Sequence, residues 1–363
     1  MKSTRMKSIK QYVNVGLLVG GLLSLLPSFA FAQTTVTGEV YLDVNADAVS
    51  IRHQQRDRMD RGLGEMEVDL LGPQAVHQAW TRAFGDFSFE EVPDGTYLMT
   101  VTADMTSLYC SSHNLPSRLP QAVLEGHVQL VAFGDSLAVT GSDRTFPTRV
   151  ADYLSALAAV DLRNVAIGGS TAAQWVPGTP YFEDILVPAL EDADLVMFSL
   201  GGNDFGAYFG EPPYDQGEFV QLLAGFPEAY QGIKEDLVAI AEEIHTRFPD
   251  VDVAYIVYPN FVNTTVFETY LGDLWPTAKK VVYAVFSDMR NAMAALDYVI
   301  LIDMLDALGP EPIDDLLIDA VHSNDAGHQA YADEIFYTIG GVVVGTTPLG
   351  LDRSYALAPR VLE

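Results

Sequence analysis

From residue 127 onward, short apolar runs alternate with segments of helical spacing, and this rhythm limits the fold more than any other feature. Five apolar runs have the length of buried strands, and they lie at 128–133, 165–167, 194–200, 251–258 and 298–302. Helical periodicity occurs at 146–157, 218–247, 276–296 and 325–338, with a break near Gly225 and Pro227. Strands joined by crossover helices form a parallel sheet that is covered on both faces. We therefore predict an α/β domain with a five-stranded parallel sheet and functional residues at the carboxyl ends of its strands.

Polar motifs follow four of these apolar runs. In chain order they are Gly134-Asp135-Ser136, Gly168-Gly169, Gly202-Asn203-Asp204 and Asp319-Ala320-Val321-His322. A carboxylate three residues before a histidine can hold one ring nitrogen, which leaves the other facing a serine as general base. An asparagine amide can donate to a developing oxyanion. Each motif alone is also an ordinary turn or helix cap. The four together, in this order, indicate nucleophilic catalysis.

This combination resembles the SGNH hydrolase superfamily, the GDSL esterases and lipases, over about residues 127–340. The resemblance implies a flavodoxin-like three-layer α/β/α sandwich that hydrolyses carboxylic esters through an acyl-enzyme, with no cofactor for catalysis. It assigns Ser136 as nucleophile, His322 as general acid and base, and Asp319 as the residue that orients His322. Two alternatives stay open, a carbohydrate O-acetyl esterase of the same superfamily and a non-catalytic surface or adhesion protein.

The same resemblance implies an oxyanion hole made of the Ser136 backbone N–H, the Asn203 side chain and a glycine N–H. The family's glycine stands five residues after an asparagine, which selects Gly169 rather than Gly168 when counted from Asn164. Four aromatic residues after these loops are candidates for an acyl or alcohol pocket or for the core, namely Trp175, Phe205, Tyr208 and Phe209.

Residues 33–106 contain several short alternating segments separated by turn signals, which predict a small all-β sandwich. This segment resembles the SdrD B-like and prealbumin-like β-sandwich modules of secreted and surface proteins. In those modules an Asp-x-Asn-x-Asp loop often holds calcium, and Asp43, Asn45 and Asp47 have that spacing. Ala48 stands where the usual glycine would follow, so a polar hairpin start is the alternative. A linker is predicted at 107–126 and a C-terminal tail at 341–363.

The first 32 residues have the pattern of a bacterial-type signal peptide. A cationic start precedes the apolar stretch 13–26, and Ala30-Phe31-Ala32 provides a cleavage site after Ala32. That stretch is shorter than the ~20 residues of a spanning helix, and no later segment could span a membrane. We expect a secreted or periplasmic protein without a transmembrane segment in its mature form.

The charge balance narrows the choice of partners. With 49 Asp+Glu against 20 Lys+Arg the formal net charge is −29, which argues against nucleic acid, because phosphate binding needs clustered Lys and Arg. The single cysteine, Cys110, cannot form an intramolecular disulfide. The predicted partner is therefore a small-molecule, lipid or glycan ester, and the oligomeric state is left open.

Overall fold

The computed structural model describes residues 10–18, 34–43, 61–62, 64–102, 118–209 and 216–344. The chain divides into two compact units. The α/β unit comprises Pro116–Thr338 with Ser50–Arg52, and the β unit comprises Met1–Val49, His53–Leu115 and Ile339–Glu363. Each unit has its own sheets and is described by itself.

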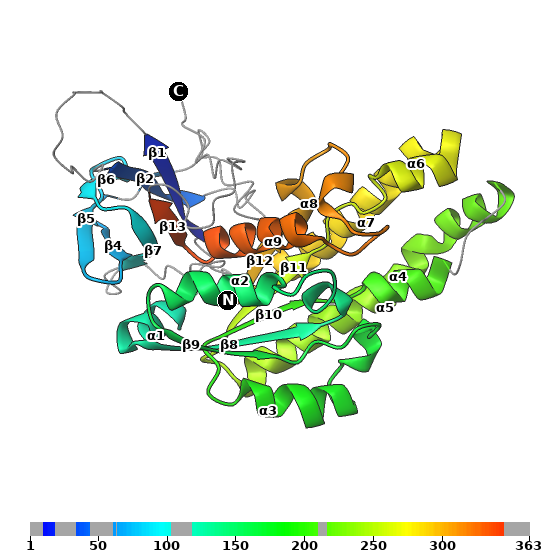
Figure 1. Cartoon of the computed structure of the whole chain (residues 1–363), viewed down its shortest axis with the longest axis horizontal. Coiled ribbons are helices and arrows are strands. Elements are labelled where there is room, and N and C mark those ends of the chain that lie inside the picture. The colour runs from blue at the N-terminus through cyan, green and yellow to red at the C-terminus, as the bar shows by residue number, and fades with distance from the viewer. Residues whose placement is uncertain are drawn as a thin grey trace, which may run out of the picture. The chain divides into compact units, whose positions relative to one another are not determined.

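The α/β unit is built on one five-stranded sheet, as the alternating pattern predicts (Figure 1). Its strands are β8 (His127–Gly134), β9 (Ala159–Asn164), β10 (Leu195–Ser199), β11 (Asp252–Val257) and β12 (Val299–Asp303). All four pairings are parallel, and the spatial order is β9-β8-β10-β11-β12. This is the flavodoxin-like order, in which the chain reverses direction across the sheet between β8 and β10. The α/β part of the predicted fold class is confirmed.

Helices cover both faces of this sheet and complete three layers (Figure 1). On one face α2 (Phe146–Ser155) packs against α9 (Asp325–Thr338), with Tyr153 stacked on Phe336 at a ring-centroid distance of 4.7 Å. On the other face α5 (Gln216–Arg247) packs against α7 (Trp275–Ala294). The remaining helices are α1 (Leu119–Glu125), α3 (Val187–Leu190), α4 (Gly202–Phe209), α6 (Thr265–Leu271) and α8 (Met304–Ala307).

Two predicted elements of this unit differ from the structure. The second strand is β9, which precedes the predicted run 165–167, because β9 is a half-exposed edge strand without a continuous apolar run. Residues Val165 and Ile167 still donate backbone hydrogen bonds to Ala132 and Gly134 as they leave the sheet. The predicted break in the long helix is wrong, since α5 continues through Pro227, whose side chain is exposed.

The β unit contains two antiparallel sheets that share one core, which confirms the predicted sandwich. One sheet is formed by β2 (Thr34–Asp43) with β1 (Lys10–Leu18), β3 (Arg61–Gly62) and β6 (Asp86–Val92). The other has the order β13-β7-β4-β5, with β13 (Gly341–Val344), β7 (Gly95–Thr102), β4 (Glu67–Leu71) and β5 (Val76–Trp80). Both sheets contribute to the buried cluster, through Val36, Phe87 and Phe89 from the first and Val68, Leu70, Tyr97 and Met99 from the second.

The predicted tail and linker need correction where the structure describes them. The start of the predicted tail is the edge strand β13, which pairs with β7 from Gly341↔Leu98 to Val344↔Gly95. Helix α1 occupies part of the predicted linker and belongs to the α/β unit. Strand β1 lies within the predicted signal peptide and pairs with β2 from Lys10↔Asp43 to Leu18↔Thr35.

Candidate active site

Ser136 begins a short 3₁₀ turn just after strand β8, which lies between β9 and β10 in the sheet. The Asp135 side chain caps this turn, because its Oδ1 accepts a hydrogen bond from the Leu137 N–H at 3.0 Å. Gly134 lies at φ +124°, and a Cβ there would come within 2.2 Å of the Ser199 carbonyl oxygen. Only glycine therefore lets the ends of β8 and β10 approach closely enough to set the Ser136 turn at the sheet edge.

His322 lies on the loop between β12 and α9 and reaches Ser136 from there. Its Nε2 is 2.9 Å from the Ser136 Oγ, and its Nδ1 is 2.7 Å from the Asp319 Oδ2. An ionised carboxylate only accepts hydrogen bonds, so Nδ1 carries the proton and the Nε2 lone pair faces the serine hydroxyl. The side chains of Asp319, His322 and Ser136 are thus linked by consecutive hydrogen bonds.

Asp319 is held by the backbone of its own loop. Its Oδ1 accepts hydrogen bonds from the N–H of Val321 at 2.9 Å and of His322 at 2.7 Å. Burial acts to raise the pKa of Asp319, but these two bonds and the imidazole outweigh burial and lower the pKa below its usual value. The carboxylate therefore stays ionised at neutral pH and keeps its orientation toward the ring.

A second histidine, His328, fixes this loop to the serine turn without reaching the site. Its ring is fully buried, with Nε2 2.8 Å from the Thr140 carbonyl and Nδ1 3.3 Å from the Phe146 N–H. Burial lowers the pKa of His328, so the neutral ring donates through Nε2 and accepts at Nδ1. Next to Thr140, Gly141 lies at φ +99°, where a Cβ would come within 2.0 Å of the Ser323 carbonyl oxygen. Only glycine at position 141 therefore allows this close contact with the loop of His322.

Of the three predicted oxyanion donors, the Ser136 N–H follows β8, Gly169 lies on the loop after β9, and Asn203 lies in the first turn of α4 after β10. The Asn203 Nδ2 donates one hydrogen to the Ser170 carbonyl at 2.8 Å, which leaves its second hydrogen for a ligand. Asp204 joins the same loops, because its Oδ2 accepts from the Ala172 N–H at 2.9 Å. Gly169 lies at φ +80°, and its N–H has no hydrogen-bond partner within the described part of the chain.

Tyr258, the first residue after β11, binds the carboxylate beside the serine. Its hydroxyl donates to the Asp135 Oδ2, and its oxygen accepts from the Gly202 N–H. Burial raises the pKa of Asp135 to about 6, although the hydrogen bonds from Tyr258 and Leu137 lower it. Burial and the Asp135 charge hold the pKa of Tyr258 well above its usual value, so it remains a donor. Tyr258 thus connects the Ser136 turn to the start of the Asn203 helix.

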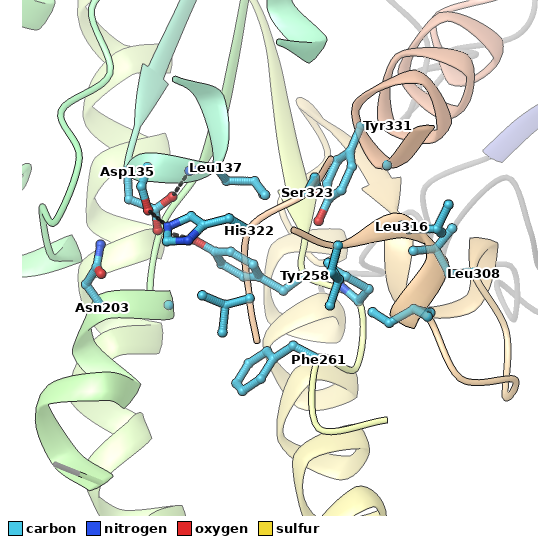
Figure 2. Close-up of a pocket in the computed structure, with 17 residues that line it drawn as sticks. Asp135, Leu137, Asn203, Tyr258, Phe261, Leu308, Leu316, His322, Ser323 and Tyr331 are labelled. Carbon is cyan, nitrogen blue, oxygen red and sulfur yellow. Dashed lines mark hydrogen bonds between the residues drawn. The ribbon is translucent and has the colours of Figure 1, made fainter. Parts of the chain in front are cut away.

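A cavity of about 110 Å³ opens beside Ser136, Asn203 and His322. Most of its remaining lining is apolar and includes Leu137, Phe261, Leu308, Ile313, Leu316 and Val321. In Figure 2, Leu308 and Leu316 lie at the end away from Asn203 and His322. The arrangement places the Ser136 hydroxyl and the His322 imidazole side by side in the lining of a mostly apolar pocket.

Some predicted site residues are not part of this arrangement. Trp175 and Phe205 are buried in the core instead of lining the cavity, and the Trp175 Nε1 donates to the Ser170 Oγ at 2.9 Å. Asp43 ends β2, whereas Asn45, Asp47 and Cys110 lie outside the described residues. The ranges that the structure describes contain no group of three or more His, Cys, Asp or Glu side chains placed to hold a metal ion.

Sequence reasoning missed Tyr258 and the cavity residue Tyr331. Tyr258 could have been found, because it follows a predicted buried strand at the edge where functional groups gather. Tyr331 carries no such signal, since an aromatic residue on an amphipathic helix is usually core.

The sequence matches the model of the GDSL-like lipase/acylhydrolase family over residues 132–330, more than half of the chain. The chain belongs to this family. No curated protein sequence matches it.

Solved structures that resemble the chain cover about three fifths of it. They include an acetylxylan esterase from Geobacillus stearothermophilus, at 18% identity and TM-score 0.39, covering 61% of this chain and 97% of that one. An extracellular lipase from Streptomyces rimosus has 18% identity and TM-score 0.43, with 58% and 99% covered. A phospholipase A1 from Streptomyces albidoflavus has 17% identity and TM-score 0.45, with the same coverage. At these identities and scores the neighbours do not bear on the substrate of this chain. Among the described helices none is both long and apolar enough to cross a membrane.

Proposed function

We propose that the chain is a serine hydrolase of carboxylic esters, of the esterase or lipase type, with Ser136, His322 and Asp319 as its triad. The observation that carries this proposal is the row from the Ser136 Oγ through the His322 ring to Asp319, with spacings of 2.9 Å and 2.7 Å, at the mouth of an apolar cavity. A base within hydrogen-bond reach of the nucleophile, itself oriented by a third group, is the geometry that activates a serine.

In the acylation step, the Ser136 Oγ attacks the ester carbonyl carbon while its proton passes to the His322 Nε2. The carbonyl oxygen becomes an oxyanion, which the N–H groups of Ser136 and Gly169 and the free hydrogen of Asn203 Nδ2 stabilise. The imidazolium gives its proton to the leaving alkoxide as the C–O bond breaks, and Asp319 stabilises the imidazolium throughout.

In the deacylation step, water takes the place of the alcohol. His322 removes a proton from that water, and the hydroxide attacks the acyl-enzyme carbonyl. The second tetrahedral intermediate uses the same three donors. It collapses to release the carboxylic acid, and Ser136 recovers its proton from His322.

Two alternatives fit the site less well. A carbohydrate O-acetyl esterase would place only a two-carbon acyl group in the cavity of about 110 Å³ and leave much of its apolar lining unfilled. A non-catalytic surface protein would have no use for an oriented imidazole beside a serine hydroxyl. The geometry therefore favours ester hydrolysis with a larger acyl group.

The test is the hydrolysis of butyrate esters by the whole protein and by Ser136→Ala. We expect a ~10⁴- to 10⁶-fold loss of kcat in the variant, together with loss of labelling by a serine-reactive phosphonate. Ser155→Ala is the matched control, because Ser155 is an exposed serine on α2 that bonds only to the Ala151 carbonyl. Equal activity in Ser136→Ala and the wild type would overturn the triad assignment.

We further propose that the protein is exported, with cleavage after Ala32, and that its β unit is an SdrD B-like module. Calcium at Asp43, Asn45 and Asp47 belongs to the same proposal, since alternating oxygen donors suit a hard cation. The N-terminal sequence of the mature protein tests the first point. Calorimetric titration of the whole chain with calcium tests the calcium site, and the absence of binding heat at millimolar calcium would contradict calcium binding.

A further inference from the structure

We propose that the cavity beside Ser136 binds the acyl part of the substrate and selects a short chain that carries a hydroxyl group. The substrate class is then an ester of a hydroxylated acid of about four to six carbons. This inference rests on the proposed ester hydrolysis and names the substrate of the same site.

The size of the cavity sets the chain length. A protein cavity of ~150 Å³ lined by Leu, Ile and Phe holds one benzene molecule, which has six carbons. The cavity here is about 110 Å³, so it holds a slightly smaller group. Leu308 and Leu316 line the end away from His322 (Figure 2), where the far end of a bound acyl chain would lie.

The lining indicates what kind of group fills the cavity. Leu137, Ile313 and Leu316 are almost completely buried, and each presents only hydrocarbon to the space. A sugar ring would lose hydrogen bonds to water there without gaining replacements. An alkyl chain is the group that gains by entering such a lining.

Two hydroxyl groups interrupt this apolar lining. Tyr331 on α9 and Ser323 on the loop of His322 are both buried and both line the cavity. In Figure 2 the Tyr331 oxygen points into the space enclosed by the lining residues. Neither hydroxyl has a hydrogen-bond partner among the residues that the structure describes, whereas Tyr258 in the same cavity is fully bonded. A hydroxyl that opens onto an apolar cavity can form a hydrogen bond to a ligand that carries a matching polar group.

The charge of the cavity excludes acidic acyl groups. Asp135 is the ionisable residue of the lining besides His322 and the tyrosines, and burial raises its pKa to about 6. A second carboxylate from a dicarboxylic acyl group would face this charge at neutral pH and would be repelled. A neutral hydroxyl meets Tyr331 and Ser323 without that cost.

The test compares methyl 3-hydroxybutyrate with methyl butyrate, each kcat/KM being divided by the rate constant for hydroxide hydrolysis of the same ester. We expect the wild type to prefer the hydroxylated ester at least tenfold. In Tyr331→Phe the preference should fall to about threefold or less, because the variant has no hydroxyl to bond to the hydroxylated ester. Tyr270→Phe, which alters an exposed tyrosine that does not line the cavity, should keep the full preference.

A chain-length series from methyl acetate to methyl decanoate checks the size. The optimum should lie at four to six carbons, with methyl decanoate at least tenfold slower, and Leu308→Ala should move the optimum to longer chains. Should Tyr331→Phe fail to fold, Ser323→Ala provides the same comparison of the two butyrates. Hydrolysis of methyl butyrate with no preference for the hydroxylated ester would overturn this inference and leave the proposed function intact. Hydrolysis of no ester at all would overturn both.

Discussion

The Tyr258 hydroxyl donates a hydrogen bond to the carboxylate of Asp135, the residue immediately before Ser136. Both side chains are buried, and the same tyrosine accepts the Gly202 N–H next to Asn203. One phenol therefore joins the nucleophile turn on β8 to the oxyanion loop on β10. The pair joins the Ser136 turn to the start of α4, two segments that follow different strands of the sheet.

Removing this hydroxyl should cost stability in a pH-dependent way. We expect Tyr258→Phe to lower the free energy of unfolding by ~1–3 kcal/mol at pH 8, where Asp135 is ionised and would lose its donor. The loss should be smaller at pH 5, below the Asp135 pKa of about 6. Urea unfolding at the two pH values measures this. Tyr283→Phe is the control, since Tyr283 bonds to Asp306 at the surface, and an equal effect of both variants would contradict the prediction.

The raised pKa of Asp135 also predicts how stability varies with pH. Because its pKa is about 6 in the folded chain against 3.8 in the unfolded chain, the folded state binds more protons between these values. The contribution of Asp135 is therefore fully present below pH 3.8 and is lost as pH rises through about 6. The residue in Asp135→Asn does not titrate. Relative to that variant, the free energy of unfolding of the wild type should fall by up to ~3 kcal/mol between pH 4 and pH 8. A difference between the two proteins that is constant with pH would count against the raised pKa.

Replacing His322 should affect mainly activity, whereas replacing His328 should affect mainly stability. His322→Ala should reduce kcat for ester hydrolysis by ~10⁴-fold or more, with a change in unfolding free energy under ~1 kcal/mol. His328→Ala should instead destabilise the fold by ~2–4 kcal/mol, because it removes a fully buried ring with two hydrogen bonds. Thermal unfolding with kinetics at a temperature where both variants are folded separates the two roles. The assignment fails if His328→Ala loses its activity while its stability is unchanged.

His328 further predicts a loss of stability in acid. Burial lowers its pKa below the unfolded value of 6.5, so below that pH the unfolded chain binds more protons than the folded one. The wild type should therefore lose stability relative to His328→Ala as pH falls from 7 to 5. Parallel unfolding curves for the two proteins over this range would contradict a neutral buried ring.

The strand β13 should stabilise the β unit and not the α/β unit. Truncation before Gly341 removes the partner of β7 and the core contact of Val342, which should destabilise the β unit by ~2–4 kcal/mol. Truncation after Val344 is the matched control and keeps the strand. Protease sensitivity of residues 64–102 reports on the β unit, while hydrolysis of methyl butyrate should stay within twofold in both proteins. Unchanged protease resistance after the longer truncation would rule out a stabilising role for β13.

Much of the catalytic unit could be predicted from the sequence, because periodicity is a local property. The predicted helix 325–338 matches α9, and four of the five predicted strands overlap those of the sheet. The missed strand, β9, is half exposed at the edge and has no apolar run to mark it. The continuity of α5 through Pro227 was also missed, because local propensity does not include the tertiary contacts that hold a long helix together.

The order of the motifs along the chain was enough to predict the α/β unit and its candidate site residues, whereas contacts between distant residues became visible only in the folded structure. Ser136, Asn203, Asp319 and His322 could be predicted as site residues because their motifs follow strands that end at one edge of a parallel sheet. The bond between Tyr258 and Asp135, the meeting of Tyr331 with Ser136 in one cavity lining and the pairing of β13 with β7 bring together residues that are distant along the chain. No local pattern encodes such contacts, since burial and pairing arise only when the whole chain has packed.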